Sequence, residues 1–418
     1  MPQSSERIAV TGLGAVSPLG PDLVSTWRAI LSCSSGIVAL DPAWCADLGT
    51  RIGGRCNFDV TQVMESFEAR RLDINSQMAT LASLEAWDHA GRPDVSPDRT
   101  SVVFGCGMGG LGTLERQWNV LQTRGPERVH PLTVPMLMPN APAAQVGFAL
   151  GVTGGVHAPT AACASGAEAI VWGMDLLRLG RADAVLVGGV EAAVNRLALV
   201  AFGAMRALSQ SNTNPEEASR PFDRGRDGFV LAEGAAALVL ERESDSRARG
   251  HEPLGYLVGA GSSSDSHHVA VPEPEGRQAE RAMAIAMADA GINPNQLAFI
   301  NAHATGTALG DLAEARALGR LCSNLPDHHL PWVTAPKALL GHLLGAAGAM
   351  ESVLTVLALR DGVVPPGRNC NDPDAALRLP LVLERPQPIE ANLRHALNNC
   401  FGFGGHNVAL VFEAPRCS

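Results

Sequence analysis

Thr160-Ala-Ala-Cys163-Ala-Ser-Gly-Ala-Glu168 is the stretch around which the rest of this chain is organised. Before it, Gly154-Gly-Val-His-Ala-Pro159 breaks the chain and restarts it in an extended run. After it, apolar residues recur at helical spacing and predict one helix over residues 164–179. Cys163 is therefore expected at a sharp turn from strand to helix, among small residues that let a substrate come close.

This position suits a nucleophile. Unpaired N–H groups in the first turn of a helix favour an anion, so they favour the thiolate of Cys163 over the thiol. A backbone N–H at such a turn can also form half of an oxyanion hole. The alternative interpretation is a buried cysteine without reactivity, and the choice depends on which side chains the rest of the chain brings to it.

Composition limits the classes of function. A chain of 418 residues with 46% hydrophobic and 18% charged residues is long and apolar enough for one large domain or two moderate ones. The formal net charge of −10 argues against nucleic-acid binding. No apolar run resembles a signal peptide or a transmembrane segment, and a cytoplasmic protein is expected. The nine cysteines lack any C-x-x-C pair, which predicts reduced thiols without a disulfide framework or a zinc site; they are Cys33, Cys45, Cys56, Cys106, Cys163, Cys322, Cys370, Cys400 and Cys417.

Strand and helix patterns alternate along the chain. Residues 7–20 are expected to form a buried strand followed by a glycine-rich turn. Further strands are expected over residues 101–105, 183–191 and 235–241, and helices over residues 21–32 and 78–89. This alternation predicts an α/β layered fold with a largely parallel sheet.

An internal repeat divides the chain. Ser165-Gly-Ala-Glu-Ala-Ile-Val resembles Ala347-Gly-Ala-Met-Glu-Ser-Val, and Val10-Thr-Gly-Leu-Gly14 resembles Leu257-Val-Gly-Ala-Gly261. We interpret the chain as two copies of one α/β unit, residues 1–250 with the cysteine and residues 251–418 with the remaining catalytic candidates. The helix after Cys163 and a helix over residues 345–359 are then equivalent and face each other; chance similarity between Ala/Gly-rich helices is the alternative.

The second half of the chain contributes three further signals. A strand leads to His303 in a Gly/Thr turn, His342 follows a short turn after Lys337, and residues 396–407 form a glycine-rich loop. Lys337 is the single lysine among 32 basic residues, which marks a position where arginine would not serve. The cysteine and histidines lack the spacing of a local zinc site. A Cys–His–Asp hydrolase is possible, but two histidines without an evident orienting carboxylate better suit enolate stabilisation during carbon–carbon bond formation on thioesters.

Four motifs together resemble the elongating β-ketoacyl-[acyl carrier protein] synthases. They are Thr160-Ala-Ala-Cys163-Ala-Ser-Gly, Asn301-Ala-His303-Ala-Thr-Gly-Thr, Lys337-x4-Gly-His342-x-Leu-Gly-Ala-Ala-Gly and Asn399-Cys-Phe-Gly-Phe-Gly-Gly, and they occur in the family's order. Phe403-Gly-Gly-His-Asn-Val-Ala-Leu is similar to the mycobacterial and actinobacterial branch, where His replaces the usual Thr. The resemblance implies the thiolase fold, with duplicated βαβαβαββ halves in a five-layer α-β-α-β-α sandwich, and a dimer.

The resemblance also implies a reaction and its catalytic residues. Cys163 takes the acyl chain as a thioester, and malonyl-acyl carrier protein is then decarboxylated and condensed with it. His303 and His342 assist decarboxylation and hold the enolate oxygen. Lys337 fixes the histidine geometry together with Glu351, Asp311 or Glu314. The backbone N–H groups of Cys163 and Phe401 form the oxyanion hole, and Phe401 acts as the gate between acylation and condensation.

Substrate contacts follow from the same resemblance. The pantetheine arm is expected at Thr305 and Thr307, and the acyl pocket is expected at Met108, Ala162 and Phe202. Exposed arginines can dock the acidic carrier protein, and the candidates are Arg70, Arg71, Arg128 and Arg206. No metal or resident cofactor is implied, because the substrates travel on the phosphopantetheine of the carrier protein.

Three related interpretations stay open. The chain could be the catalytic ketosynthase subunit of a type II polyketide or polyene synthase, paired with a chain-length factor in place of a homodimer. A thiolase uses the same fold with a second catalytic cysteine, and Cys400 lies in the corresponding glycine-rich segment. A non-catalytic chain-length factor shares the fold but lacks the nucleophile that Cys163 provides.

Overall fold

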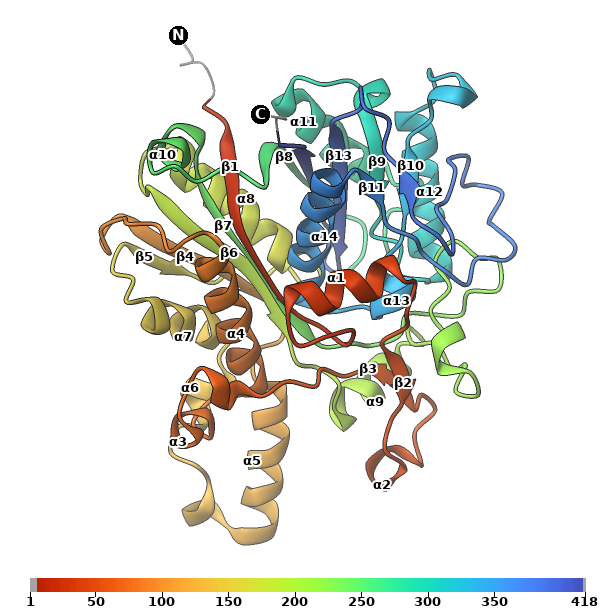
Figure 1. Cartoon of the computed structure of the whole chain (residues 1–418). Coiled ribbons are helices and arrows are strands. Elements are labelled where there is room, and N and C mark those ends of the chain that lie inside the picture. The colour runs from red at the N-terminus through yellow and green to blue at the C-terminus, as the bar shows by residue number, and fades with distance from the viewer. Residues whose placement is uncertain (1–5, 416–418) are drawn as a thin grey trace.

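A ten-stranded sheet runs through the computed structural model, which describes residues 6–415 (Figure 1). Its strand order is β10-β9-β13-β14-β8-β1-β7-β6-β4-β5, so five strands of the earlier part of the chain lie beside five of the later part. The earlier strands are β1 (Ile8–Val16), β4 (Thr100–Cys106), β5 (Gly155–His157), β6 (Ala184–Glu191) and β7 (Gly234–Arg242). The later strands are β8 (Gly255–Ser264), β9 (Leu297–Asn301), β10 (Trp332–Thr334), β13 (His395–Gly402) and β14 (His406–Glu413).

The two sets of strands are joined at the centre of the sheet by a short antiparallel pairing. Residues Ile8–Val10 of β1 pair with Gly255–Leu257 of β8. Outward from this pairing, the order β7, β6, β4, β5 on one side corresponds to β14, β13, β9, β10 on the other. The equivalent positions of β1 and β8 confirm that the repeated Val-Thr-Gly-Leu-Gly and Leu-Val-Gly-Ala-Gly segments occupy matching places.

Helices cover the sheet in layers. Helices α4 (Ile74–His89) and α7 (Ala141–Leu150) pack on the outer face of the earlier strands, and α11 (Arg277–Ala290) packs on the outer face of the later strands beside α12 (Ala308–Leu321). Helices α8 (Ser165–Arg178) and α14 (Ala347–Asp361) pack against each other between the two sets of strands. The expected α-β-α-β-α order is confirmed, and both parts follow the order βαβαβαββ: β1-α4-β4-α7-β5-α8-β6-β7 and β8-α11-β9-α12-β10-α14-β13-β14.

Glycines explain why the repeated segments carry their pattern. A Cβ atom added at Gly12 or Gly14 would lie 2.0 Å from a backbone oxygen of α4, so only glycine lets α4 pack this closely on β1. Gly259 and Gly261 face α11 in the same way, at 2.2 Å. The repeated glycines therefore allow two equivalent close contacts, of α4 with β1 and of α11 with β8.

The two central helices also pack through small residues. A Cβ atom at Gly166 would lie 2.9 Å from the backbone nitrogen of Ala349, and one at Gly348 would lie 2.7 Å from the Cβ of Ala167. This reciprocal contact confirms the expected facing of the two helices. The second helix begins at Ala347, after the 3-10 helix η6 (Leu344–Ala346), and ends at Asp361.

Two expectations about the sheet were wrong. The sheet is mixed, because the strands on both sides of the central β1–β8 pairing run antiparallel to their neighbours and only β4, β5, β6 and β9, β10, β13 pair in parallel. The expected loop over residues 396–407 is the hairpin β13–β14, whose turn is residues 403–405. The glycines there serve a tight turn, since Gly404 and Gly405 have φ values of +84° and +80°.

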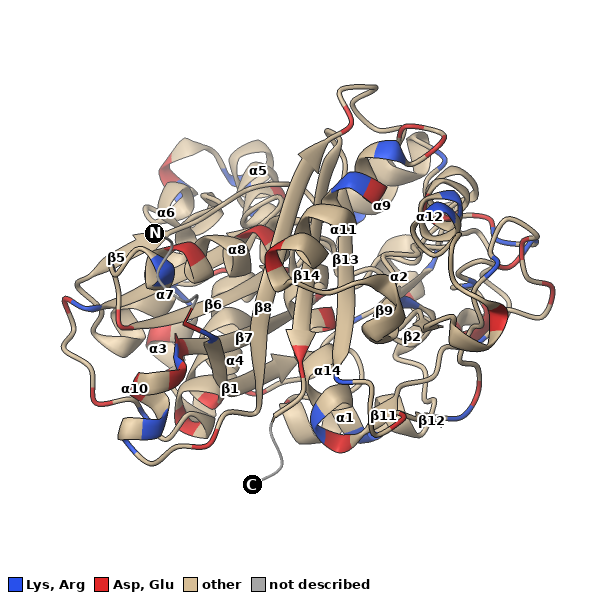
Figure 2. Cartoon of the chain, turned by 90° about the horizontal axis from the view of Figure 1, so that it is seen from above, with Lys and Arg blue, Asp and Glu red and all other residues tan. Residues whose placement is uncertain are grey.

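The remaining elements lie mainly around this core. In Figure 2 the central strands β8, β13 and β14 carry few charged residues, whereas charged residues lie mainly on peripheral helices and loops. No helix within residues 6–415 has the length and hydropathy needed to cross a membrane. The remaining elements around the core are α1 (Leu23–Leu31), β2 (Ile37–Ala39), α2 (Pro42–Cys45), β3 (Ile52–Gly54), η1 (Val60–Gln62), α3 (Ser66–Ala69), α5 (Leu111–Arg124), η2 (Pro126–Arg128), α6 (Thr133–Leu137), α9 (Arg196–Ala204), η3 (Pro215–Glu217), α10 (Glu243–Ala248), η4 (Pro294–Gln296), η5 (Asp327–His329), α13 (Lys337–Leu340), β11 (Val363–Val364) and β12 (Gln387–Pro388).

Candidate active site

Cys163 lies on a strained turn just before α8. Ala162 adopts a left-handed conformation with φ of +48°, which a short side chain tolerates better than a bulky one. The hydroxyl of Ser165 holds the turn on both sides, because it accepts the N–H of Ala161 at 2.9 Å and donates to the carbonyl oxygen of Ala162 at 2.6 Å. The turn that carries Cys163 is thus held by residues adjacent to it in the sequence.

His342 contacts this cysteine directly. Its Nε2 lies 3.1 Å from the Sγ of Cys163. The backbone of His342 is fixed across the two parts of the chain, since its N–H donates to the carbonyl of Val230 at 2.7 Å and its carbonyl accepts the N–H of Ala232 at 3.0 Å. The ring of Phe229 packs edge-on against the imidazole, with 5.2 Å between ring centroids.

His303 stands beside His342 at the end of β9. The two imidazole rings lie 5.4 Å apart between centroids and are nearly perpendicular. Glu314 on α12 holds the backbone of this turn, because its carboxylate accepts the N–H of His303 at 2.9 Å and that of Ala304 at 2.7 Å. This anchoring keeps Ala304 at a φ of +23°, a conformation that would otherwise be costly for a residue with a side chain.

The three acidic candidates for the partner of Lys337 have separate tasks. Lys337 is 1% exposed, and its Nζ donates to the carboxylate of Glu351 on α14. Glu314 binds backbone N–H groups and the side-chain amide of Asn399 at 3.0 Å. Asp311 accepts the N–H of Gly306 at 3.0 Å and lies next to Arg226. Of the three, Glu351 therefore forms the ion pair with the lysine.

Burial and charge set the protonation states. Burial raises the pKa of Cys163 to about 12, while the Lys337 charge and backbone N–H groups act to lower it. Burial therefore favours the thiol over the thiolate in the free protein, against the preference expected from the start of the helix, because desolvation outweighs the nearby charge and N–H groups. Burial and the Lys337 charge hold the pKa values of His303 and His342 well below the usual range, so both imidazoles are neutral at neutral pH.

A second phenylalanine lies near the thiol. The backbone N–H groups of Cys163 and of Phe403, two residues beyond Phe401, act to lower the pKa of the thiol. Phe401 belongs to the β13–β14 ladder, where it pairs with Asn407, and its ring lies 5.7 Å from that of His303. Because the strand continues further than the sequence indicated, Phe403 is a candidate for the oxyanion N–H beside the expected Phe401.

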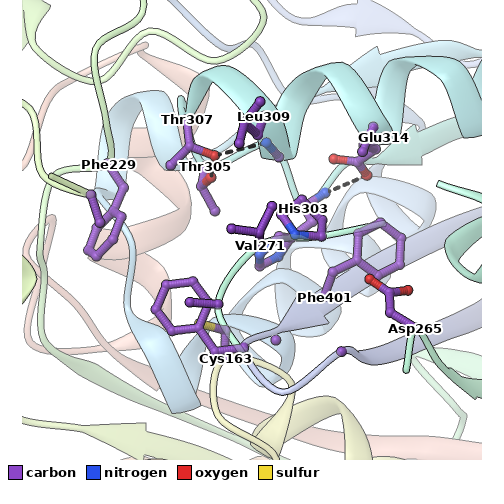
Figure 3. A pocket seen from close by; sticks show the side chains of 18 of the residues that line it. Cys163, Phe229, Asp265, Val271, His303, Thr305, Thr307, Leu309, Glu314 and Phe401 are labelled. Atoms are coloured by element: carbon purple, nitrogen blue, oxygen red, sulfur yellow. Dashed lines mark hydrogen bonds between the residues drawn. The ribbon is translucent and has the colours of Figure 1, made fainter. Parts of the chain in front are cut away.

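A cavity of about 440 Å³ leads to these side chains (Figure 3). Cys163, His303 and His342 line this cavity, and so do Thr305, Thr307 and Phe401. Figure 3 also shows Phe229, Val271 and Leu309 turned toward the same space. The cavity thus collects residues from both parts of the chain and both pantetheine candidates.

The candidates for the acyl pocket lie outside the lining of this cavity. Met108 and Phe202 pack instead against the apolar cluster that contains Cys163, Phe229 and Leu344. Ala162 contributes the strained turn described above. An acyl chain on Cys163 would therefore reach Met108 and Phe202 only by entering the packed apolar side of the site.

The four arginine candidates are all exposed but do not form one group at the cavity. Arg206 lines the cavity mouth. Arg70 and Arg71 follow α3, and Arg128 ends η2 after α5, so these three belong to the lobe that α3, α5 and α6 form below the sheet in Figure 1.

Cys400 does not occupy the place of a second catalytic cysteine. Its buried Sγ donates to the carbonyl oxygen of Cys163 at 3.1 Å, and the residue is not part of the cavity lining. The eight cysteines within the described residues are free thiols, and Cys417 lies outside those residues. Sequence reasoning missed Phe403 and Leu344, although both stand inside the quoted glycine-rich and His342 motifs.

Two family models match the chain. "Beta-ketoacyl synthase, N-terminal domain" matches residues 5–246, and "Beta-ketoacyl synthase, C-terminal domain" matches residues 254–371.

The chain belongs to the β-ketoacyl synthase family.

Two relatives of the synthase, from different bacteria, have the same name. The chain is 42% identical to 3-oxoacyl-[acyl-carrier-protein] synthase 2 of Mycobacterium tuberculosis (strain ATCC 25618 / H37Rv) over 408 residues, covering 97% of this chain and 96% of that one. It is 38% identical to the protein of the same name from Vibrio harveyi over 413 residues, covering 98% and 99%. The expected reaction class is confirmed: the synthase is a condensing acyltransferase of the elongating type.

Solved structures of related ketosynthases have the same fold. The ishigamide ketosynthase/chain length factor matches with a TM-score of 0.91 and 27% identity, covering 99% of this chain and 100% of that chain. A ketosynthase from a type II polyketide synthase, in complex with its acyl-carrier protein, matches with a TM-score of 0.89 and 27% identity, covering 98% and 100%. The expected thiolase fold is confirmed.

Proposed function

We propose that the synthase elongates an acyl chain by decarboxylative condensation at Cys163. The observation that carries this proposal is the contact of 3.1 Å between Cys163 Sγ and His342 Nε2, with His303 beside it at the end of a cavity. In the first step Sγ attacks the thioester carbonyl of an acyl-carrier protein, the thiol proton passes to His342, and the pantetheine sulfur leaves as a thiol. The N–H groups of Cys163 and Phe403 hold the oxyanion.

The second step joins two carbons. The malonyl group loses CO₂, and the enolate oxygen that forms is held by the Nε2–H groups of His303 and His342. His342 must by then have moved its ring proton from Nδ1 to Nε2, because Nε2 accepts the thiol proton in the first step. The enolate carbon attacks the acyl carbonyl on Cys163, and the Cys163 sulfur leaves as a thiolate that takes a proton from solvent. Neutral imidazoles suit this role because they can donate hydrogen bonds to the enolate without a proton being lost first. These steps use the residues of this chain, the carrier-bound substrates and one proton from solvent.

We assign the gate to Phe403. Phe401 is held in a strand, whereas Phe403 begins a turn whose next two residues are glycines with positive φ. A turn of this kind can change conformation without breaking a ladder of strand hydrogen bonds. Thr305 and Thr307 would accept and donate hydrogen bonds to the pantetheine arm along the cavity wall.

Acyl-enzyme formation tests the proposal. The protein incubated with acyl-carrier protein should gain one acyl mass on the peptide that contains Cys163, and Cys163→Ala should gain none. Peptide mass spectrometry reads the site. Acylation of Cys106 or Cys400 in the wild-type protein, with Cys163 free, would contradict the assignment.

Further proposals concern the partners and the pathway of the synthase. We propose an acyl carrier protein as substrate carrier, docking at Arg206 and at the arginines of the α3–α5–α6 lobe. We also propose that each chain consists of two thiolase-like halves, residues 1–250 and 251–418, and that whole chains form a cytoplasmic dimer. One form of this dimer is a homodimer. The similarity to a ketosynthase/chain length factor favours the alternative of a catalytic polyketide subunit. Mass measurement of the purified chain, alone and mixed with a chain-length factor from the same genome, distinguishes the two.

Chain length should depend on Met108. This side chain is unbranched and flexible, so it can move aside for an acyl chain that enters the apolar cluster beside Cys163. Met108→Trp should shorten the accepted acyl chains while leaving acetyl or butyryl transfer to Cys163 within a few fold of the wild-type rate. Product analysis by mass spectrometry checks this. An unchanged product spectrum would place the end of the pocket elsewhere.

A further inference from the structure

One buried carboxylate beside the site has no task in the proposed reaction. Glu191 is the last residue of β6 and is 0% exposed. Its Oε2 accepts the N–H of Gly107 at 2.9 Å and that of Gly345 at 3.2 Å, and its Oε1 accepts the N–H of Met108 at 3.2 Å. All of these donors are uncharged backbone groups, so the carboxylate binds two segments of main chain and does not pair with a cation through them.

The two segments come from different parts of the chain and both touch the site. Gly107 and Met108 follow β4, and the carbonyl of Cys106 just before them accepts the hydroxyl of Thr160 at 3.0 Å, in the stretch that leads to Cys163. Gly345 lies in η6, three residues after His342 and next to Leu344, which lines the cavity. Glu191 therefore connects the segment of the acyl-pocket candidate Met108 to the segment of the catalytic candidate His342.

The glycines on both segments fit this connection. A Cβ atom at Gly107 would lie 2.6 Å from Glu191 Oε2, and one at Gly345 would lie 2.8 Å from the same oxygen. A side chain at either position would push the main chain away from the carboxylate. The close approach of three N–H groups to one buried carboxylate thus depends on glycine at 107 and 345.

We propose that Glu191 is a positioning residue that holds the Met108 segment and the His342–Gly345 segment at a fixed distance on the two sides of Cys163. This inference rests on the proposed function, because it takes Cys163 and His342 as the reacting groups and Met108 as a wall of the acyl pocket. The acyl chain and the histidine must both be placed correctly for condensation. A loosened connection should therefore affect long acyl chains more than short ones.

Glu191→Gln tests the connection with little change in volume. An amide has one oxygen in place of two, so it cannot accept all three N–H groups, and its NH₂ would face at least one of them. Hydrogen exchange of the peptides that cover residues 106–110 and 343–347 should be faster by about tenfold or more. Condensation should fall by roughly tenfold to a hundredfold, with the larger loss for longer acyl chains.

Glu85 provides a matched control. Its carboxylate is also largely buried and accepts two backbone N–H groups, from Ala15 and Leu23, each at 2.9 Å, away from the cavity. Glu85→Gln should speed exchange around residues 15 and 23 and leave the preference for acyl-chain length unchanged. The comparison separates a general loss of stability from an effect on the site.

The outcomes are distinguishable. If Glu191→Gln leaves exchange at residues 106–110 and 343–347 at the wild-type rate, the connection is not what holds these segments and the proposal fails. If exchange rises but the ratio of rates for long and short acyl chains matches that of Glu85→Gln, Glu191 stabilises the fold only, and the positioning role fails. A wild-type protein that does not acylate Cys163 would instead overturn the proposed function, and the exchange measurement would still report on the connection.

Discussion

His303→Ala is expected to lose condensation while keeping acylation of Cys163. The thiol contacts His342 at 3.1 Å, whereas the ring of His303 lies beside that of His342, with 5.4 Å between centroids, in the same cavity. Removing His303 takes away one of two donors to the enolate oxygen and leaves the thiol–imidazole contact in place. Loss of a positioned proton donor of this kind costs roughly a hundredfold to ten-thousandfold in rate.

Two half-reactions separate the roles. Acylation of Cys163 by acyl-carrier protein, followed by mass spectrometry, should remain within a few fold of wild type, and release of CO₂ from malonyl-carrier protein should fall with condensation. His251→Ala is the control, because His251 makes a side-chain contact with the backbone carbonyl of Thr11 away from the cavity. Condensation by His303→Ala at nearly the wild-type rate would remove His303 from the enolate site; a loss of acylation would show that it acts on the thiol.

Lys337→Arg is expected to lower condensation by about a hundredfold although the charge is conserved. The ammonium is buried, donates to Glu351 and lies close enough to affect the pKa values of Cys163, His303 and His342. A guanidinium is wide and planar, so it cannot occupy the same space without moving the surrounding groups. A shift of the imidazoles of about an ångström is enough for a loss of this size.

The effect of the shape of the side chain at position 337 can be measured separately from the effect of its charge. The Lys337 charge lowers the pKa of Cys163, so the pH profile of Cys163 alkylation should change little in Lys337→Arg. In Lys337→Met/Glu351→Met the charge is gone, and the alkylation profile should move to higher pH. Circular dichroism and thermal melting check that both variants fold. Ordinary turnover by Lys337→Arg would show that the shape of the lysine has no role in the site.

The sequence predicted the site better than it predicted the sheet. Cys163, His303 and His342 stand beside glycines and small residues at the ends of strands, and this local pattern survives in the fold because turns are set by neighbouring residues. The partner of Lys337 could not be chosen from the sequence. Glu351, Asp311 and Glu314 are equally acidic, and only the packing of α14 against the sheet brings Glu351 to the ammonium.

The remaining differences have related causes. The motif Phe401-Gly-Phe-Gly-Gly contains two phenylalanines, and the choice between their N–H groups depends on where the β13 ladder ends, which is a property of its pairing with β14. The mixed direction of the sheet depends on β1 and β8 meeting at the centre, a contact between residues more than 240 positions apart. Glu191 gave no signal, since a strand ending in glutamate has no distinctive spacing and its three donors come from two distant segments.

The burial of Lys337 has a consequence for the chemical handling of the protein. Because the chain contains no other lysine, the folded molecule presents no lysine amine to an acylating dye, an aldehyde cross-linker or a biotin ester. Such reagents can reach the ε-amine only when the region between α13 and α14 opens. The extent of labelling at Lys337, read separately from that of the α-amine at the N-terminus, therefore measures how often this region opens, with no background from other lysines.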